Sequence, residues 1–213
     1  MDLLDHDDSL FVGVLTGSGG NFCAGADLKA IARGERPATT RGGGGMMKTP
    51  SRKPLIAAVE GWALGGGFEL CMSCDLIVAA RDARFGLPEV KRNLVATGGG
   101  LFRLPKRIPY GLAMEFALLG EPQSTDFFAP YGIINRVTEP GSALATALAL
   151  AEQLNARAPN VLASIKELVS DAPRNTLSAH LASERDHFVK NLHHANAGAG
   201  IAAFLDKHTP QYE

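Results

Sequence analysis

The first half of the chain alternates short apolar runs with glycine-rich turns. Residues 10–16, 54–60 and 75–80 are apolar runs of strand length, and the first two are followed closely by glycines. Such runs between turn residues are typical of buried strands. Residues 67–73, between the second and third runs, have the pattern of a short buried helix. Since parallel strands need a long crossover connection, this order predicts parallel strands joined by helices.

A less regular segment separates the first two predicted strands. Residues 27–33 fit a short helix, whereas residues 34–49 contain Pro37 and four consecutive glycines at 42–45. This composition favours backbone freedom over a packed element. The sequence therefore predicts a mobile surface loop over residues 34–49.

The second half has apolar residues at helical spacing. The pattern predicts helices over residues 110–119, 143–156, 160–170 and 176–193, and a short last helix over 201–207. No internal repeat or clear linker interrupts the chain. We therefore expect an α/β core over residues 1–140 and a helical C-terminal region over residues 141–213.

Composition and charge limit the classes of partner. The 213 residues are 46% hydrophobic and 20% charged, which suits one domain with a sizeable core. A net charge of −1 gives no electrostatic reason to expect nucleic acid or an anionic membrane as a partner.

Cysteine content and hydropathy indicate the compartment. The three cysteines cannot all pair with one another, so a reducing compartment is expected. The first eight residues are largely acidic and lack the apolar core of a signal peptide. No apolar stretch has the length of a membrane-spanning helix. The sequence thus predicts a cytoplasmic protein without a membrane span.

Two glycine turns each lie between a predicted strand and a predicted helix, at residues 22–27 and 61–69. The first N–H groups of a helix have no intrahelical partner and lie at the positive end of its dipole, so they bind negative oxygens. Two such turns on neighbouring strands would direct two N–H groups at one oxygen, with about 3–4 kcal/mol of stabilisation per donor. Taken singly, each turn is better explained by the backbone freedom of glycine in a tight strand-to-helix turn.

Two glutamates accompany these turns. Glu69 is one helical turn beyond Gly66, in an otherwise apolar segment, and Glu89 lies in a predicted loop after the third strand. Two carboxylates from separate segments would flank a substrate carbon and a water molecule. Burial and mutual repulsion would raise the pKa of at least one of them toward the range useful for proton transfer. A helix-start glutamate and a solvated loop charge are the ordinary alternatives.

Other motifs support no nucleotide, metal or serine-peptidase chemistry. Residues 17–22 lack the last glycine of a dinucleotide fingerprint, and residues 42–49 lack the glycine that precedes the lysine of a P-loop. Cys71 and Cys74 have zinc-like spacing without a second ligand pair, which favours a core position. Trp62 is likewise expected in the core. No serine–histidine pair lies in the turns, which argues against a ClpP-like peptidase.

Together these segments resemble the enoyl-CoA hydratase/isomerase (crotonase) family. The matching residues are 22–28, 53–70, 74–79 and 85–89, followed by the glycines at 98–100 and by residues 132–137. The resemblance extends from about Leu10 to the C-terminus. It implies an α/β fold, namely a crotonase-like ββα spiral core with a C-terminal α-helical extension.

The resemblance also implies roles for particular residues. The N–H groups of Ala26 and Gly66 match the family's oxyanion hole, and Glu69 and Glu89 match its two catalytic glutamates. Glu69 would activate the water that adds at C3, and Glu89 would deliver a proton to C2. Contacts to the substrate or to its coenzyme A part are implied for Ala24, Asp27, Leu28, Gly65, Phe204 and Lys207.

The function that the resemblance implies is hydration of trans-2-enoyl-CoA to 3-hydroxyacyl-CoA. The alternatives are an enoyl-CoA isomerase or another crotonase-type acyl-CoA enzyme and, from another class, a non-catalytic acyl-CoA-binding protein. The partner is an acyl-CoA thioester, and we expect no metal and no cofactor beyond the coenzyme A of the substrate. Assembly as a homotrimer or a hexamer, a dimer of trimers, is implied, with residues 141–213 as the trimerisation region.

Two departures from the family pattern lead to further expectations. Relatives begin earlier, with strands and a helix that this chain lacks, which would leave residues 10–16 at an unpaired edge and weaken solubility or coenzyme A binding relative to a longer form. Pro130 lies where relatives have a helix, and proline at this position predicts that the helix is shortened.

Overall fold

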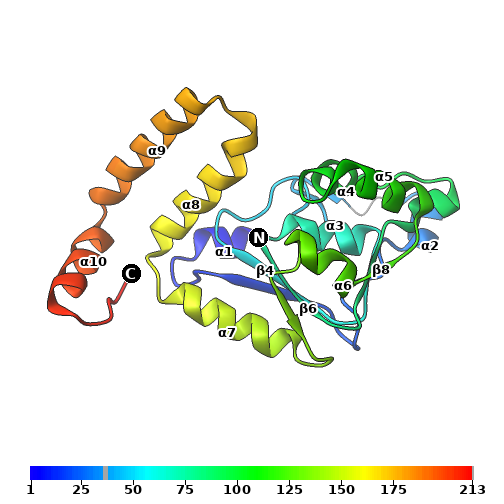
Figure 1. The fold of residues 1–213 in the computed structure, drawn as a ribbon, viewed down its shortest axis with the longest axis horizontal. Coiled ribbons are helices and arrows are strands. Elements are labelled where there is room, and N and C mark those ends of the chain that lie inside the picture. Colours follow the sequence, from blue (N-terminus) through cyan, green and yellow to red (C-terminus); the bar gives the residue numbers. More distant parts are fainter. Residues whose placement is uncertain (36–37, 213) are drawn as a thin grey trace. The chain divides into compact units, whose positions relative to one another are not determined.

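The structure is a computed structural model that describes residues 1–35 and 38–212 (Figure 1). The chain divides into two compact units. The first comprises Met1, Val14–Pro50 and Leu55–Ala149, and the second comprises Asp2–Gly13, Ser51–Pro54 and Leu150–Glu213. The first unit contains almost all of the strands, whereas the second is mainly helical. The boundary between residues 140 and 141 stays a prediction.

A four-stranded sheet forms the centre of the first unit, with strand order β1-β4-β6-β9. Its strands are β1 (Gly13–Thr16), β4 (Leu55–Val59), β6 (Leu76–Ala80) and β9 (Arg136–Thr138). β4 and β6 are parallel, and β6 and β9 are also parallel. The parallel arrangement predicted from the sequence is confirmed for β4 and β6, whereas β9 was not predicted as a strand. β1 is shorter than the predicted run of residues 10–16.

The apolar composition of β4 explains its central position. All five of its residues are fully buried, as expected for a strand that is covered on both faces. Its first N–H, from Leu55, donates to the Asp75 carboxylate at 2.8 Å, which fixes where β4 and β6 begin to pair.

A second sheet, absent from the sequence-based expectation, consists of β5 (Trp62–Leu64), β7 (Arg84–Gly86) and β8 (Gln123–Ser124). β5 and β7 pair in parallel, and β7 and β8 pair in antiparallel fashion. Successive residues of a strand face opposite sides of the sheet. Ala63 is therefore fully buried while Trp62 is 45% exposed, so the predicted core position of Trp62 is wrong.

Aromatic side chains hold the helices of the first unit on this second sheet. Phe68 of α3 (Gly66–Ser73) contacts Phe85 of β7 at a ring-centroid distance of 5.5 Å. Phe116 of α5 (Tyr110–Leu119) and Phe128 of α6 (Thr125–Phe128) complete the cluster, with their centroids 5.3 Å apart. The tilted and edge-to-face geometries are those that aromatic pairs prefer. The unit also contains α2 (Leu28–Ala32), α4 (Gly100–Arg103) and the first part of α7 (Ala143–Asn155).

The predicted mobile loop over residues 34–49 is wrong for the described part of that segment. β2 (Ala38–Thr39) and β3 (Gly42–Gly43) form a small antiparallel hairpin. Met46 and Met47, which follow it, are only 1% and 9% exposed. Pro37 lies outside the described residues. The glycines here serve a tight hairpin that places two methionines in the core.

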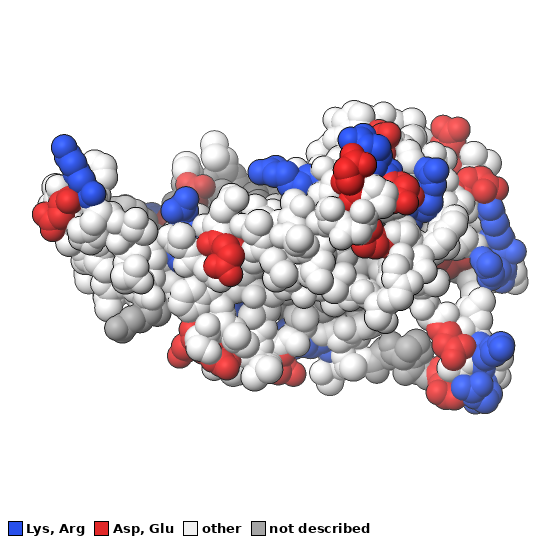
Figure 2. All heavy atoms as spheres, turned by 90° about the horizontal axis from the view of Figure 1, so that it is seen from below, with Lys and Arg blue, Asp and Glu red and all other residues white. Residues whose placement is uncertain are grey.

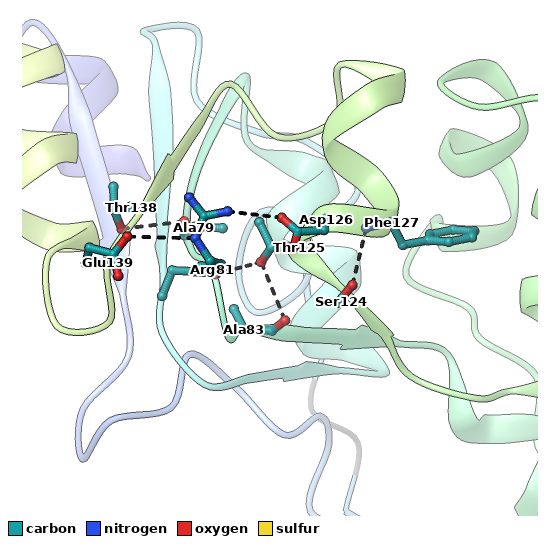
Figure 3. Close-up of polar contacts among 10 residues, drawn as sticks. Ala79, Arg81, Ala83, Ser124, Thr125, Asp126, Phe127, Thr138 and Glu139 are labelled. Carbon is teal, nitrogen blue, oxygen red and sulfur yellow. Dashed lines mark hydrogen bonds and ion pairs between the residues drawn. The ribbon is translucent and has the colours of Figure 1, made fainter.

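The α-helix near Pro130 is short, and its shortening relative to the family stays a prediction. α6 has four residues and is followed by a 3₁₀ helix over Ala129–Tyr131. Figure 3 shows part of how α6 is fixed: the Ser124 hydroxyl accepts the Phe127 N–H at 3.3 Å. The Thr125 hydroxyl also donates to the Ala80 carbonyl at 2.6 Å. Near them, Arg81 lies 3.5 Å from Asp126 and 3.7 Å from Glu139.

The charged side chains form mixed surface pairs. Lys91 and Glu121 are 2.6 Å apart, and Arg33 and Glu35 are 2.8 Å apart. On the face drawn in Figure 2, basic and acidic side chains lie next to one another. Exposed pairs of this kind contribute little to stability because water and salt screen them.

The second unit contains α1 (Asp2–His6), α8 (Pro159–Asp171), α9 (Leu177–Leu192) and α10 (Ala195–Asp206), and α7 (Ala143–Asn155) continues into it. A 3₁₀ helix over Ala172–Arg174 joins α8 to α9. Amide side chains link the helices: Asn160 donates to Asn191 at 2.6 Å and accepts from Asn196 at 2.9 Å. α10 begins six residues before the predicted helix because the His194 ring caps its N-terminus.

Candidate active site

The two glycine turns lie side by side in the first unit. The Cys23 N–H donates to the Trp62 carbonyl at 2.9 Å, and the Leu64 N–H donates back to the Cys23 carbonyl at 2.9 Å. This short parallel bridge brings the amides of Ala26 and Gly66 together. A β-carbon added to Gly66 would lie 3.9 Å from the Ala26 nitrogen. Two amide donors from separate turns therefore border one small volume.

Glycine is required in these turns by backbone geometry and by space. Gly25 and Gly65 have φ angles of +103° and +54°, which L side chains rarely adopt. A β-carbon at Gly67 would overlap the Cys23 carbonyl oxygen. The sequence of the turns is thus dictated by the close approach of the two segments.

The amide groups of the two turns are available to a ligand. α3 begins at Gly66, and its N-cap residue, Gly65, provides no side-chain cap. Among the residues that the structure describes, neither the Ala26 N–H nor the Gly66 N–H donates a hydrogen bond to the protein. N–H groups at a helix N-terminus without a protein acceptor favour a negatively charged oxygen.

Glu69, in the first turn of α3, is almost completely buried at 3% exposure. Its Oε1 atom accepts the Gly100 N–H at 2.8 Å. Burial raises the pKa of this carboxyl, and the N–H groups of Gly100 and Gly98 and the charge of Arg103 oppose the rise. Glu69 is therefore a buried carboxylate whose ionised form is supported by nearby donors.

Glu89 lies in a 3₁₀ helix over Pro88–Arg92, and the predicted loop at this position is wrong. A β-carbon at Gly65 would be 2.8 Å from Glu89 Oε1, so this carboxylate borders the same turn. Its Oε2 atom is buried and has no hydrogen-bond partner among the described residues. Burial raises the pKa of Glu89, opposed by its own N–H, and the charge of Glu69 raises the pKa further.

A cavity of about 370 Å³ opens beside Glu89. It is bounded by apolar side chains of the 3₁₀ helix, α4 and α5, among them Leu87, Val90, Leu104, Ala113 and Met114. Within the described part of the chain, Glu89 is the only acidic residue of its lining. Apolar walls with one polar group are typical of small-molecule sites.

The remaining residues singled out in the sequence are divided between the two units. Ala24, Asp27 and Leu28 are exposed beside the first turn, and the Asp27 carboxylate caps α2 by accepting the Lys29 N–H at 2.8 Å. Phe204 is 83% exposed on α10, and Lys207 ends that helix in the left-handed conformation. Both belong to the second unit, and their contacts to coenzyme A stay predictions.

Sequence reasoning missed two side chains near Glu69, Met47 and Arg103. Gly98–Gly100 entered only as a family match, although these glycines hold the Glu69 carboxylate. Cys71 and Cys74 are buried, which confirms their expected core position. Over residues 1–35 and 38–212, the structure has no cluster of three metal-binding side chains and no helix that could cross a bilayer.

Comparison with known proteins gives concordant matches. A sequence profile described as enoyl-CoA hydratase/isomerase matches residues 1–213. The carnitinyl-CoA dehydratase of Salmonella typhi is 38% identical over 216 residues, which cover 97% of this chain and 83% of the relative.

Solved structures match over nearly the whole chain. An enoyl-CoA hydratase from Mycobacterium marinum is 48% identical with a TM-score of 0.96, covering 99% of this chain and 84% of that chain. An enoyl-CoA hydratase from Mycobacterium tuberculosis H37Rv is 46% identical with a TM-score of 0.96, covering 100% and 84%. These matches confirm the crotonase-like α/β fold with a helical C-terminal region.

Proposed function

The chain belongs to the enoyl-CoA hydratase/isomerase family, and on this premise we propose that it adds water reversibly to trans-2-enoyl-CoA, giving 3-hydroxyacyl-CoA. One observation carries the proposal. Two carboxylates from separate elements, Glu69 and Glu89, border the turns whose amides form the candidate oxyanion hole. Water addition needs one group that activates water and another that supplies a proton, and two such groups are available.

The oxyanion hole polarises the substrate. In the proposed mechanism the thioester oxygen accepts hydrogen bonds from the N–H groups of Ala26 and Gly66. As water adds at C3, electron density moves to this oxygen and an enolate forms. Fixed amide donors at the N-terminus of α3 stabilise that charge without having to reorient during the reaction.

The two glutamates divide the proton transfers. The water oxygen bonds to C3 while Glu69 takes one of its protons, and Glu89 gives a proton to C2. Hydrogen bonding to Gly100 supports an ionised Glu69. The buried Oε2 atom of Glu89 has no donor among the described residues, which supports a neutral, protonated side chain. Exchange of a proton with solvent then restores the starting state, and the reverse sequence is dehydration.

The other expectations from the family resemblance belong to the same proposal. Ala24, Asp27, Leu28 and Gly65 would contact the thioester, and Phe204 and Lys207 would reach the coenzyme A nucleotide of a neighbouring subunit. We also propose that the protein forms a homotrimer or hexamer, is cytoplasmic and needs no separate cofactor.

An assay with crotonyl-CoA tests the proposal directly. Hydration removes the conjugated double bond, so the thioester absorbance falls. We expect the Glu69→Gln and Glu89→Gln substitutions each to lower kcat about 10²- to 10⁴-fold, the usual contribution of a general acid or base. Glu115→Gln, at an exposed position on α5, makes the same chemical change away from the site and is the control. Full activity in either site variant would refute the assignment.

Dehydration of carnitinyl-CoA is a second candidate, because a relative with that name is 38% identical to this chain. It follows the reverse of the same proton transfers, and parallel assays with crotonyl-CoA and carnitinyl-CoA rank the two substrates. Conversion of a 3-enoyl-CoA without hydration would indicate an isomerase. Tight binding of acyl-CoA without turnover of any of these thioesters would indicate a binding protein.

A further inference from the structure

Arg103, the last residue of α4, connects two segments that are far apart in the sequence. Its Nη1 atom donates to the Gly98 carbonyl at 3.0 Å, and its Nη2 atom donates to the Met47 carbonyl at 2.6 Å. A planar guanidinium has several N–H donors in a fixed arrangement, so it can hold two carbonyls at once.

Both segments that Arg103 holds pack against Glu69. A β-carbon added to Gly98 would lie 2.6 Å from Glu69 Oε2 and would overlap the sulfur atom of Met47. A β-carbon added to Gly66 would lie 3.7 Å from the terminal methyl group of Met47. The thioether of Met47 therefore lies close to Gly66 of the candidate oxyanion hole and, like the Glu69 carboxylate, against Gly98.

The local sequence leaves room for this arrangement. Gly99 has a φ of +98°, and a β-carbon there would overlap the Arg103 guanidinium. The next residue, Gly100, donates its N–H to Glu69. The glycine turn thus bonds Glu69 through one residue and Arg103 through another.

We propose that Arg103 is a positioning residue, whose guanidinium fastens the Met47 segment and the Gly98 turn around Glu69 and so holds the Glu69 carboxylate and the adjacent wall of the substrate site. This role rests on the proposed function, in which Glu69 activates water. The thioether of Met47 then limits the space next to the carboxylate, and Arg103 fixes its main chain.

Electrostatics act in the same direction as geometry. The charged groups that bear on Glu69 are Arg103, whose charge lowers its pKa, and Glu89, whose own pKa is raised by the charge of Glu69. A base that activates water must be ionised, so the positive charge of Arg103 favours the working form of Glu69.

The chain provides a matched control. Arg107 follows Arg103 by four residues and also donates to a main-chain carbonyl, that of Met72, at 3.1 Å. Arg107 and Arg103 therefore differ in which carbonyls they hold, not in the kind of interaction. Replacing Arg107 tests what the loss of a half-buried arginine does to the fold without releasing Met47 or the Gly98 turn.

Kinetics of Arg103→Lys, Arg103→Met and Arg107→Met test the proposal. Lysine keeps the charge but has no planar fork, so we expect kcat to fall roughly 10- to 100-fold, with KM changed about threefold or less and an unshifted pH profile. Methionine also removes the charge, so the acid limb of kcat/KM moves to higher pH. In Arg107→Met, stability falls and the acid limb stays in place. A wild-type pH profile in Arg103→Met, or an equal shift in Arg107→Met, would overturn the proposal.

A second measurement needs no turnover and keeps the inference separate from the proposed reaction. Urea unfolding of wild type, Arg103→Met, Glu69→Gln and the double variant measures the coupling between the two side chains. We expect the two effects to be non-additive, whereas Arg107→Met and Glu69→Gln should be additive. If the protein hydrates no enoyl-CoA, the proposed function fails but the coupling remains measurable. Additive effects for Arg103 and Glu69 would refute the positioning role.

Discussion

Glu69 and Glu89 occupy opposite kinds of surroundings within one site. Glu69 is enclosed by the Gly100 N–H, the Gly98 turn and the charge of Arg103. Glu89 borders an apolar cavity with one oxygen unpartnered. Burial raises the pKa of both carboxyls. At Glu69 two N–H groups and Arg103 oppose the rise, whereas at Glu89 its own N–H and Arg92 oppose it and the charge of Glu69 adds to it. In the proposed mechanism, therefore, the surroundings rather than the residue type make one carboxyl the base and the other the acid.

Closing the space around Glu69 is expected to have the largest effect on the difference between the two glutamates. In Gly98→Ala, the added methyl group would lie 2.6 Å from Glu69 Oε2 and would displace Met47. Because the carboxylate must then move, we expect kcat to fall up to about 100-fold. Steady-state hydration of crotonyl-CoA measures the loss.

Gly111→Ala is the control for that substitution. Gly111 lies in α5, where an added β-carbon meets no atom within 4 Å. Alanine is also the better helix former, so stability should be kept or slightly increased and kcat unchanged. Equal activity of the two variants would mean that the packing around Glu69 has no bearing on catalysis.

Only part of the fold around this site could be predicted from the sequence. The runs at residues 54–60 and 75–80 predicted strands correctly because a fully buried strand is apolar throughout. β5 and β7 were missed because each has only three residues. The alternation of side chains along β5 exposes Trp62, which the sequence had placed in the core. Short strands are defined by their partners, which the local pattern does not contain.

The residues of the candidate site could likewise be predicted only in part. Glu69 could be placed because its distance from Gly66 is set by the helix that both share. The role of residues 42–49 could not, because their glycines are typical of a loop and the burial of Met47 depends on Gly98 and Arg103, about fifty residues away. The unpartnered oxygen of Glu89 is likewise a product of tertiary packing.

A smaller effect is expected on the pH dependence of hydration, which separates the two glutamates by their pKa values. In the proposed mechanism the acid limb of the pH profile reports the ionisation of Glu69, and the alkaline limb reports the loss of the proton from Glu89. The charge of Arg92 lowers the pKa of Glu89. Arg92→Gln should therefore move the alkaline limb of kcat/KM to higher pH and leave the acid limb in place.

Salt is the internal control for the Arg92 effect. Arg92 is exposed, so its influence on Glu89 passes partly through water and is screened by ions. We expect the difference between wild type and Arg92→Gln to shrink as ionic strength increases. A shift of the acid limb instead would assign that limb to Glu89, and the proposed roles of the two glutamates would be reversed.

The smallest expected effect is on stability. A carboxyl whose pKa is higher in the folded than in the unfolded state holds its proton more tightly when folded, so its ionisation opposes folding. For Glu89 this destabilisation is absent below the ordinary pKa, grows as pH rises from the ordinary to the raised value, and is complete above it. Glu89→Gln should thus raise the midpoint of thermal unfolding by about 1–3 °C at pH 7, and the gain should disappear near pH 4. Thermal unfolding followed by circular dichroism, with Glu115→Gln as the surface control, decides the point. A gain of the same size at pH 4 would have to come from packing and not from the ionisation of Glu89.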